Sequence, residues 1–558
     1  MTINTSADIP KRVAAARKPA KAPGIRQTMS DLHIWTGLLA GWILYAMFLT
    51  GTASYFRDEI SQWMRPDVPA QLQLVDAAEM GSRLISSLQT IAPTSSQWGI
   101  KLPDARNNTA NVFWRDGKRF NRATLDPATG QKIGVRESIG GEFFYRFHFQ
   151  LHYFPVLWGR WITGLCGMFM LVAIISGVIT HKKIFIDFFT FRWGKGQRSW
   201  LDAHNGLSVL GLPFHLMITY TGLVTLMLLY MPWGSDAAFK EASQRQAMQT
   251  ELSAFVRPGQ PSGQKAELAP VAGMVQQAQA RWGEESVGGI NVNNPGDASA
   301  RVIVVRADDA RVSTSPQYMM FDGASGQLLE TKDKVGAAAE TRGVMYALHL
   351  GRFSDYPLRW LYFLVSLAGT AMVGTGLVLW TVKRRAKLPD PAKPYFGFRL
   401  VERLNITAIA GLSVAMAAFL WGNRLLPAAL ADRRVWEVDL LFIAWGATFA
   451  YALVRPAKRA WVELLWLAAG LLIFLPLLNA FTTERNLFHS IAVGDWLFAG
   501  FDLTMLAFGG LHALLAIRAQ RYQPKVRPVV RKPQQAPGMV DSHVALSPAQ
   551  APTTTEAR

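Results

Sequence analysis

The chain has 558 residues, of which half are hydrophobic and only 17% are charged, a charged share that is low for a soluble protein. Several apolar runs along the chain have the length of about 20 residues that a helix needs to cross a bilayer. We therefore expect a polytopic membrane protein embedded in a lipid bilayer. The formal charge of +19 gathers largely beside these runs, as it does in cytoplasmic loops of membrane proteins, and we expect no nucleic acid partner.

The number of cysteines and the absence of certain short motifs exclude several kinds of cofactor site. The single cysteine, Cys166, rules out a disulfide within the chain and a covalently attached c-type haem. The chain has neither the glycine-rich fingerprint of dinucleotide-binding folds nor a phosphate-binding P-loop. Any haem would therefore be held noncovalently by histidines.

The N-terminal region predicts a tail, a span and a soluble block. Residues 1–28 are basic and lack the apolar core of a signal peptide, which is typical of a disordered cytoplasmic tail. A first transmembrane span over 29–57 leads into a small α+β block over 58–147, outside the cytoplasm. Its expected elements are a helix at Val75–Ile91, strands at Asn111–Arg115 and Arg119–Leu125, and another short strand after the turn at 126–130.

The chain then continues with the same alternation. The predicted second span, third span, second soluble block and fourth span cover 148–183, 200–231, 232–343 and 344–385. A helix and two strands are expected in the second block, at Pro270–Trp282, Ala300–Arg306 and Gln317–Phe321. Cations at the ends of the second and fourth spans place those ends in the cytoplasm.

Four further apolar runs predict a membrane extension over 403–520, near Ile406–Leu425, Leu440–Leu453, Leu464–Phe481 and Trp496–Ile517. The tail over 521–558 is rich in Pro, Gln, Ala and Thr and is expected to be disordered. The predicted fold class is mainly α, with about eight transmembrane helices, two small α+β domains outside the cytoplasm and both termini inside it.

The first four spans and the two blocks read as one unit used twice. Thr50-Gly51 and Thr221-Gly222 stand at the same spacing after His33 and His204, each of which has an aspartate two positions earlier. The blocks share a turn of the form Asp-x-Ala-[Ser/Thr]-Gly-Gln, at 126–131 and 322–327. Leu151-His152 and Leu348-His349 precede the second and fourth spans, and we align these histidines.

The predicted topology sorts the histidines by depth. The cytoplasmic rim has His33, His181 and His204, and the opposite rim has His148, His152 and His349. A single rim histidine is most often an interfacial hydrogen-bonding residue, but ionisable groups in membrane segments are rare and costly, and clusters at two depths favour a function. Haem b needs two neutral imidazoles on opposite faces, often from facing helices of a bundle.

The repeat suggests two haem-binding pairs, His33 with His204 and His152 with His349. His148, His181 and His215 are alternative ligands, and His215 lies deeper within the third span. Four arginines near the outer histidines are candidates for propionate binding or, with equal weight, interfacial anchors: Arg146, Arg160, Arg352 and Arg359. His489 and His512 leave room for another cofactor in the extension.

These residues resemble a known family over about 28–387. The stretches DLHIWTGL, LDPATGQKIG, FHFQLHYF and SGVITHKK are similar to the PepSY-associated transmembrane proteins of Gram-negative inner membranes. The resemblance implies two PepSY-like domains in the periplasm, two b-type haems on the histidines named above, and the reduction of ferric siderophores to release Fe(II) for iron uptake. The electron donor would be a quinol or a separate cytoplasmic reductase.

Two other functions remain open from the sequence. PepSY domains resemble protease propeptides, so the blocks could belong to a non-enzymatic regulator or binding protein. Alternatively, the chain could be a transporter of the siderophore or of iron itself; its copies share one orientation, whereas many transporters use inverted repeats.

Overall fold

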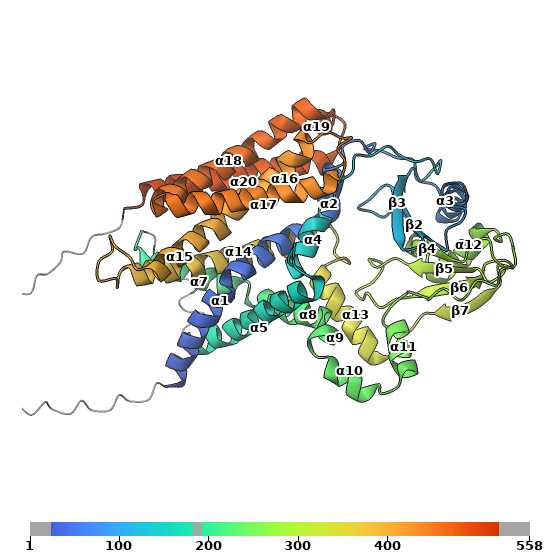
Figure 1. Ribbon diagram of the computed structural model, residues 1–558, viewed down its shortest axis with the longest axis horizontal. Coiled ribbons are helices and arrows are strands. Elements are labelled where there is room, and N and C mark those ends of the chain that lie inside the picture. Colours follow the sequence, from blue (N-terminus) through green and yellow to red (C-terminus); the bar gives the residue numbers. More distant parts are fainter. Residues whose placement is uncertain (1–23, 182–187, 189–191, 193, 524–558) are drawn as a thin grey trace, which may run out of the picture. The chain divides into compact units, whose positions relative to one another are not determined.

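The computed structural model describes residues 24–181, 188, 192 and 194–523 (Figure 1). The predicted tails over 1–28 and 521–558 fall almost entirely outside these residues, as do the cations Lys182 and Lys183. The described part is mostly helical with one antiparallel sheet, which confirms the predicted fold class of a polytopic membrane protein.

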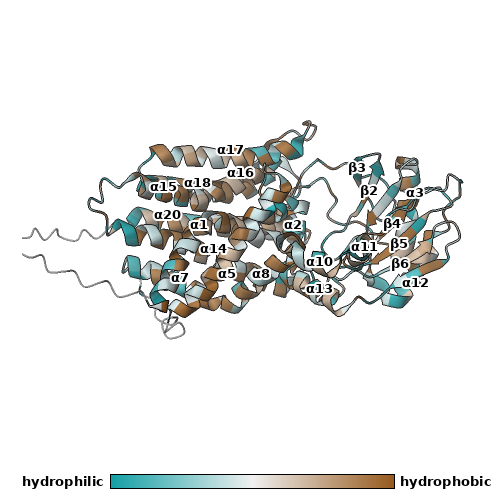
Figure 2. Cartoon of the chain, turned by 60° about the horizontal axis from the view of Figure 1, so that its bottom comes forward, coloured by the Kyte–Doolittle hydropathy of each residue, from teal (hydrophilic) through white to brown (hydrophobic). Residues whose placement is uncertain are grey.

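Seven helices are long and apolar enough to cross a membrane, and one bent pair brings the number to up to eight among the described residues. Figure 2 shows the apolar character of these helices. The seven are α1 (Ile25–Ser54), α5 (Val156–Thr180), α14 (Tyr356–Arg385), the continuous span Phe396–Leu425, α17 (Arg433–Val454), α18 (Ala457–Thr482) and α20 (Trp496–Arg521). The span Phe396–Leu425 consists of α15 (Phe396–Ile406), the π-helical turn η2 (Thr407–Gly411) and α16 (Leu412–Leu425).

The third predicted span is broken. Its two parts, α7 (Gln197–Leu210) and α8 (Leu212–Thr225), meet at Gly211 with a bend of 69°. Pro213 lies in the first turn of α8, where the N–H that proline lacks would have no partner in the helix anyway. Inside one continuous helix, the same proline would remove a backbone hydrogen bond and break the helix. The prediction of one helix over the third span is therefore wrong, and His204 and His215 lie on different helices, α7 and α8.

The first four spans pack around one another. In the bundle, α1 packs against α5 and α14, α14 packs against α7, and α5 packs against α8. Two shorter helices precede the second and fourth spans, α4 (Glu142–Phe149) and α13 (Ala337–Leu350). They occupy matching places in the repeat, because α4 packs on α1 and α13 packs on α8.

The two soluble blocks share a single seven-stranded sheet, whereas the sequence predicts two separate small domains. The order is β3-β2-β1-β4-β5-β6-β7, and all pairings are antiparallel. The strands are β1 (Gln97–Lys101), β2 (Ala110–Asp116), β3 (Arg119–Leu125), β4 (Val287–Asn293), β5 (Arg301–Arg306), β6 (Tyr318–Asp322) and β7 (Leu328–Lys332). The pairing of β1 with β4 joins the blocks.

One hydrophobic core serves both blocks. Helices α3 (Ala77–Ile91) and α12 (Val271–Trp282) pack against each other, and their buried side chains, such as Leu84 and Val275, share one cluster with Ile100 and Ile290 of the central strands. The repeated turns also match: Asp126 and Asp322 each accept two backbone N–H groups with one side-chain oxygen.

The remaining short helices lie between the larger elements or at their ends. They are α2 (Arg57–Trp63), α9 (Met227–Tyr230), α10 (Pro232–Ala238), α11 (Ala242–Glu251), the 3-10 turn η1 (Glu284–Ser286) and α19 (Leu487–Ala492).

The C-terminal extension contains a buried network of polar and charged side chains. Glu437 is fully buried and accepts hydrogen bonds from Arg433 at 2.5 Å, Asn423 at 2.7 Å and Ser138 at 2.9 Å. Arg424, also buried, donates to Asn479 at 2.8 Å and to the backbone oxygen of Trp63 at 2.6 Å.

The same network ties the extension to the rest of the chain. Asp502 accepts from the indole N–H of Trp63 at 3.0 Å and from Asn479 at 3.1 Å. Because Trp63 belongs to α2 and Ser138 lies four residues before the start of α4, the network connects the extension to the segments on both sides of the first soluble block.

Candidate functional site

Two histidines from different spans meet in the first pair, which we call the tail-side pair. The ring centroids of His33 on α1 and His204 on α7 are 6.1 Å apart. The Nδ1 of His33 donates to the backbone oxygen of Ala173 on α5 at 2.8 Å, and that of His204 donates to Met372 on α14 at 2.9 Å. The predicted partnership of His33 and His204 is thus present as a spatial pair.

A second pair, the sheet-side pair, joins the two short helices that follow the sheet-forming blocks in the chain. His148 of α4 and His349 of α13 have ring centroids 6.0 Å apart. Their Nδ1 atoms donate to the backbone oxygens of Met47 on α1 at 2.7 Å and of Ile218 on α8 at 3.0 Å.

The four histidines use the same local arrangement. Each ring lies against a glycine that comes four residues after the accepting carbonyl in the neighbouring helix. A Cβ added at Gly51 would stand 2.7 Å from His148, and one at Gly222 would stand 2.8 Å from His349. The same holds in the tail-side pair, where a Cβ at Gly376 would stand 3.1 Å from His204 and one at Gly177 would stand 3.2 Å from His33. In a helix, a side chain covers the surface of the turn that precedes its own Cα. A glycine four residues after the accepting carbonyl therefore leaves that carbonyl uncovered, and the imidazole can reach it.

The hydrogen bonds fix the tautomer of all four rings. A carbonyl oxygen can only accept, so Nδ1 carries the proton and a neutral ring has its lone pair on Nε2. A backbone carbonyl that holds Nδ1–H is also the usual outer-shell partner of a metal-binding histidine. The four rings are therefore prepared to ligate a metal through Nε2.

The spacing within each pair fits ligation of one iron from two sides. Two metal–nitrogen bonds of about 2.0 Å, with about 1.1 Å from each nitrogen to its ring centre, place centroids roughly 6 Å apart. The observed separations are 6.1 and 6.0 Å. Within the described part of the chain, no group of three His, Cys, Asp or Glu side chains is placed to hold a bare metal ion. Haem, which supplies four ligand nitrogens itself, fits a site of two imidazoles.

The alignment of His152 with His349 is wrong in space. His152 follows the end of α4, and its ring stacks on Phe442 at 5.5 Å and meets Phe143 edge-on at 5.9 Å. The connection between the histidine and the next span is longer in the first copy, so matching the Leu-His pairs selects a residue beyond the helix. His148, predicted as an alternative, takes the place beside His349.

The other two alternatives are engaged in different contacts from the paired histidines. His181 at the end of α5 accepts at Nε2 from Asn205 at 2.8 Å, which occupies the ligating nitrogen. His215 is almost fully buried in α8, edge-on to Phe48, with Nε2 at 3.4 Å from the backbone oxygen of Val365. The ring contacts of His215 are with Phe48 and Phe214.

The histidines of the extension show no such arrangement. The Nδ1 of His512 donates to Phe508 in its own helix at 2.8 Å, and His489 is exposed on α19. Nothing in their surroundings indicates a further cofactor.

Three of the four predicted propionate-binding arginines already have carboxylate partners. Arg146 pairs with Glu142 at 3.0 Å, Arg352 pairs with Asp308 at 2.5 Å, and Arg359 pairs with Glu59 at 3.1 Å. Arg160 instead contacts the amide oxygen of Gln150 at 3.2 Å.

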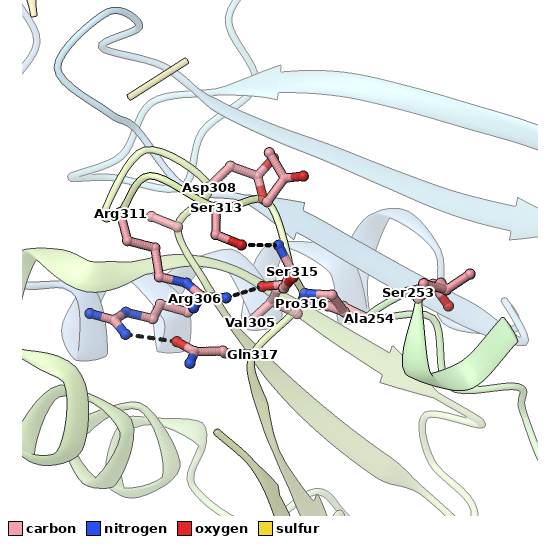
Figure 3. A pocket seen from close by; sticks show the side chains of 13 residues that line it. Ser253, Ala254, Val305, Arg306, Asp308, Arg311, Ser313, Ser315, Pro316 and Gln317 are labelled. Atoms are coloured by element: carbon pink, nitrogen blue, oxygen red, sulfur yellow. Dashed lines mark hydrogen bonds between the residues drawn. The ribbon is translucent and has the colours of Figure 1, made fainter. Parts of the chain in front are cut away.

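The sheet region has a small polar pocket, drawn in Figure 3. Its two arginines are engaged within the protein: Arg306 donates to Gln317 at 2.7 Å, and Arg311 donates to the backbone oxygen of Ser315 at 2.5 Å. The pocket has no histidine in its lining and takes no part in the site described here.

The sequence does not reveal that the four glycines Gly51, Gly177, Gly222 and Gly376 each lie against a histidine ring. Gly51 and Gly222 stand out in the repeat, yet nothing in a single sequence says that a glycine carries an imidazole. The usable signal is the recurrence of a matched glycine on each of the four spans that supply a carbonyl.

Replacing Gly51 by alanine is expected to weaken cofactor binding at the sheet-side pair by about 10–100-fold, the usual cost of disturbing an outer-shell contact. The new Cβ would lie 2.7 Å from Nδ1 of His148, so the ring must move away from the Met47 carbonyl. Gly37→Ala on the same helix is the matched control, since a Cβ there meets nothing within 4 Å. Haem titration of both variants measures the effect, and equal affinities would contradict the assigned role of the glycine.

Comparison with known proteins places these features in a family. The family described as the PepSY-associated TM region matches residues 30–383, which include both histidine pairs and all four glycines. An uncharacterized protein of Pseudomonas aeruginosa is 26% identical over 394 residues, covering 65% of this chain and 91% of that protein. The match to the family ends before the C-terminal extension.

Proposed function

The chain belongs to the family of PepSY-associated transmembrane proteins, and from this premise we propose that it is a b-type haem reductase of the bacterial inner membrane. In this proposal it passes electrons to ferric siderophores in the periplasm and releases Fe(II) for iron uptake. The observation that carries the proposal is the presence of two histidine pairs, whose ring centroids lie 6.1 and 6.0 Å apart and whose Nδ1 atoms are all bound to backbone carbonyls.

The two pairs lie at different depths of the bundle. His33 lies in the first third of α1, whereas the carbonyl and the glycine that hold His148 lie near the other end of that helix. At 1.5 Å per residue the pairs are separated by roughly 20–27 Å along α1, most of the about 30 Å hydrocarbon thickness. Haems at both sites would supply reversible one-electron chemistry on the two sides of the membrane.

The residues of the chain hold and orient the cofactors. His33 and His204 would bind one haem near the cytoplasmic face, and His148 and His349 would bind the other near the periplasmic face. The backbone carbonyls fix the planes of the rings, and the glycines admit them between the helices. Rings held in this way would limit rearrangement of a bound haem between its two oxidation states.

The proposed reaction is a one-electron reduction of chelated iron. One electron converts Fe(III) to Fe(II), which is held more weakly by the hard oxygen ligands of a siderophore and is released. The proposed electron source is a quinol or a separate cytoplasmic reductase. The proposed location of both termini in the cytoplasm agrees with the basic cluster Lys383–Arg385 at the end of α14.

The proposal is tested with the purified protein in liposomes. We expect dithionite-reduced protein to be reoxidised when a ferric siderophore is added without oxygen, and an Fe(II)-specific dye to report one Fe(II) per electron lost. Reduced haem that persists in the presence of the ferric siderophore would contradict the reductase. Passage of the intact chelate into liposomes without any reductant would favour a transporter, and a folded but colourless protein would favour a regulator.

A further inference from the structure

A cluster of cationic and aromatic side chains adjoins the sheet-side pair. Tyr145 and Tyr346 come three residues before His148 and His349 on α4 and α13, so each lies on the same helix face as its histidine. Arg342 lies one turn before Tyr346, and its guanidinium lies 4.4 Å from the centre of that ring. Both helices are entered from the soluble blocks, so the cluster is on the side of the histidines that leads to the sheet.

Arg160 at the start of α5 belongs to the same cluster. Tyr346 lies in α13, outside the membrane-spanning helices. Burial raises the pKa of Tyr346, the guanidinium groups of Arg342 and Arg160 oppose that rise, and Tyr145 adds to it. The guanidinium of Arg160 contacts Gln150 and the ring of Phe149, the two residues that follow His148, so it lies at the His148 end of the cluster.

Both arginines have hydrogen-bonding capacity to spare. The Nε atoms of Arg160 and Arg342 are buried and have no hydrogen-bond partner. Their other contacts are with neutral groups: Arg160 with Gln150 at 3.2 Å and the ring of Phe149 at 5.5 Å, and Arg342 with the hydroxyl of Tyr346 at 3.1 Å. No Asp or Glu of the described chain forms an ion pair with either arginine.

The repeat counterpart of Arg160 shows the contrast. Arg359 occupies the equivalent place on α14, yet it is paired with Glu59 at 3.1 Å and donates to the backbone oxygen of Ser354 at 2.8 Å. Arg160 and Arg342 are half-buried, and arginine is the side chain best suited to a bidentate carboxylate partner. Their unpartnered Nε atoms, with no ion pair to a described Asp or Glu, leave both free to bind a carboxylate from outside the chain.

We propose that Arg160 and Arg342 form a carboxylate cradle that holds the propionates of a haem on the sheet-side pair. This inference rests on the proposed function, because it requires a haem between His148 and His349. With a haem bound at this site, the two positive charges of the arginines would favour its reduced iron over its oxidised iron. The cradle would thereby make the periplasmic site the electron acceptor within the protein.

The test is a redox titration of the full chain carrying Arg160→Gln or Arg342→Gln. Loss of one positive charge is expected to shift the one-electron equilibrium of one haem about tenfold towards the oxidised form, which is a fall of about 59 mV in its midpoint potential. The other haem is expected to keep its potential. Arg342→Lys, which retains the charge, is expected to recover most of the shift and also serves if the Gln variant does not fold.

Arg146→Gln is the matched control, because Arg146 lies on α4 beside Tyr145 but is exposed and paired with Glu142. Equal potentials in the control and in both cradle variants would overturn the inference while leaving the proposed function intact. A weaker affinity for ferric citrate with unchanged potentials would assign the cradle to an external carboxylate ligand and overturn the propionate assignment. A protein without haem would instead refute the proposed function.

Discussion

Replacing His148 by alanine is expected to remove one of two haems, whereas replacing His152 by alanine leaves both. His148 faces His349 at 6.0 Å with its Nδ1 bound to a carbonyl, while the ring of His152 is stacked on Phe442. A haem b at this site would be held by two imidazoles, so loss of one of them would remove half of the protein's ligand set. In the proposed reductase, reduction of external ferric chelate should then fall by roughly 100-fold, the upper end of the cost of disturbing a metal ligand's partner, because one of the two proposed electron carriers is lost.

The haem content of each variant, measured against protein concentration, decides this prediction. The His148→Ala protein should contain half the haem of the original chain, and the His152→Ala protein should contain the full amount. The reverse pattern would restore the pairing of His152 with His349 that the sequence repeat suggests. His33→Ala is expected to remove the other haem, so its spectrum identifies which signals belong to the tail-side pair.

Replacing Glu437 by alanine is expected to destabilise the C-terminal extension by about 3–5 kcal/mol, the cost of removing one partner from a buried ion pair. Arg433 and Glu437 are both fully buried, and the substitution leaves the guanidinium of Arg433 without its counter-ion. The hydroxyl of Ser138 and the backbone N–H of Ile139 lose their acceptor as well. Equilibrium unfolding in mixed micelles measures the change in the free energy of unfolding.

Glu463→Ala supplies the control for this prediction. Glu463 also pairs with an arginine of the extension, Arg455, but both side chains are more than a third exposed to solvent. Water replaces that ion pair at little cost, so this variant should unfold close to the original protein. Similar destabilisation by the two substitutions would show that the buried network does not hold the extension in place.

Much of the helical architecture is predictable because each span carries its own signal. Apolar length alone identifies the membrane helices, and β3 has the predicted bounds Arg119–Leu125. The central strands β1 and β4 escape prediction because their sequences, QWGIK and VGGINVN, show no clean alternation and contain glycines that long-range pairing requires. A Cβ at Gly289 would lie 2.6 Å from the backbone oxygen of Ile100 in the partner strand.

The candidate site was predictable only where the repeat preserves spacing. His33 and His204 start equivalent helices, so the repeat aligns them correctly. Between the short helix and the following span the two copies differ in length, and sequence matching therefore selects His152 instead of His148. The carbonyls that orient the rings carry no side-chain signal at all. The break at Gly211 does have a signal, Pro213 two residues later, which the reading of one apolar span overlooks.

The central claim is that the two histidine pairs bind two haems. The most direct test is a pyridine haemochrome assay on the full chain, purified in mild detergent from cells supplied with haem, together with spectra of the oxidised and reduced protein. The account predicts two b-type haems per chain, with spectra typical of iron bound by two histidines. A folded protein without haem would contradict the account, and a single haem would leave only one of the two pairs as a binding site.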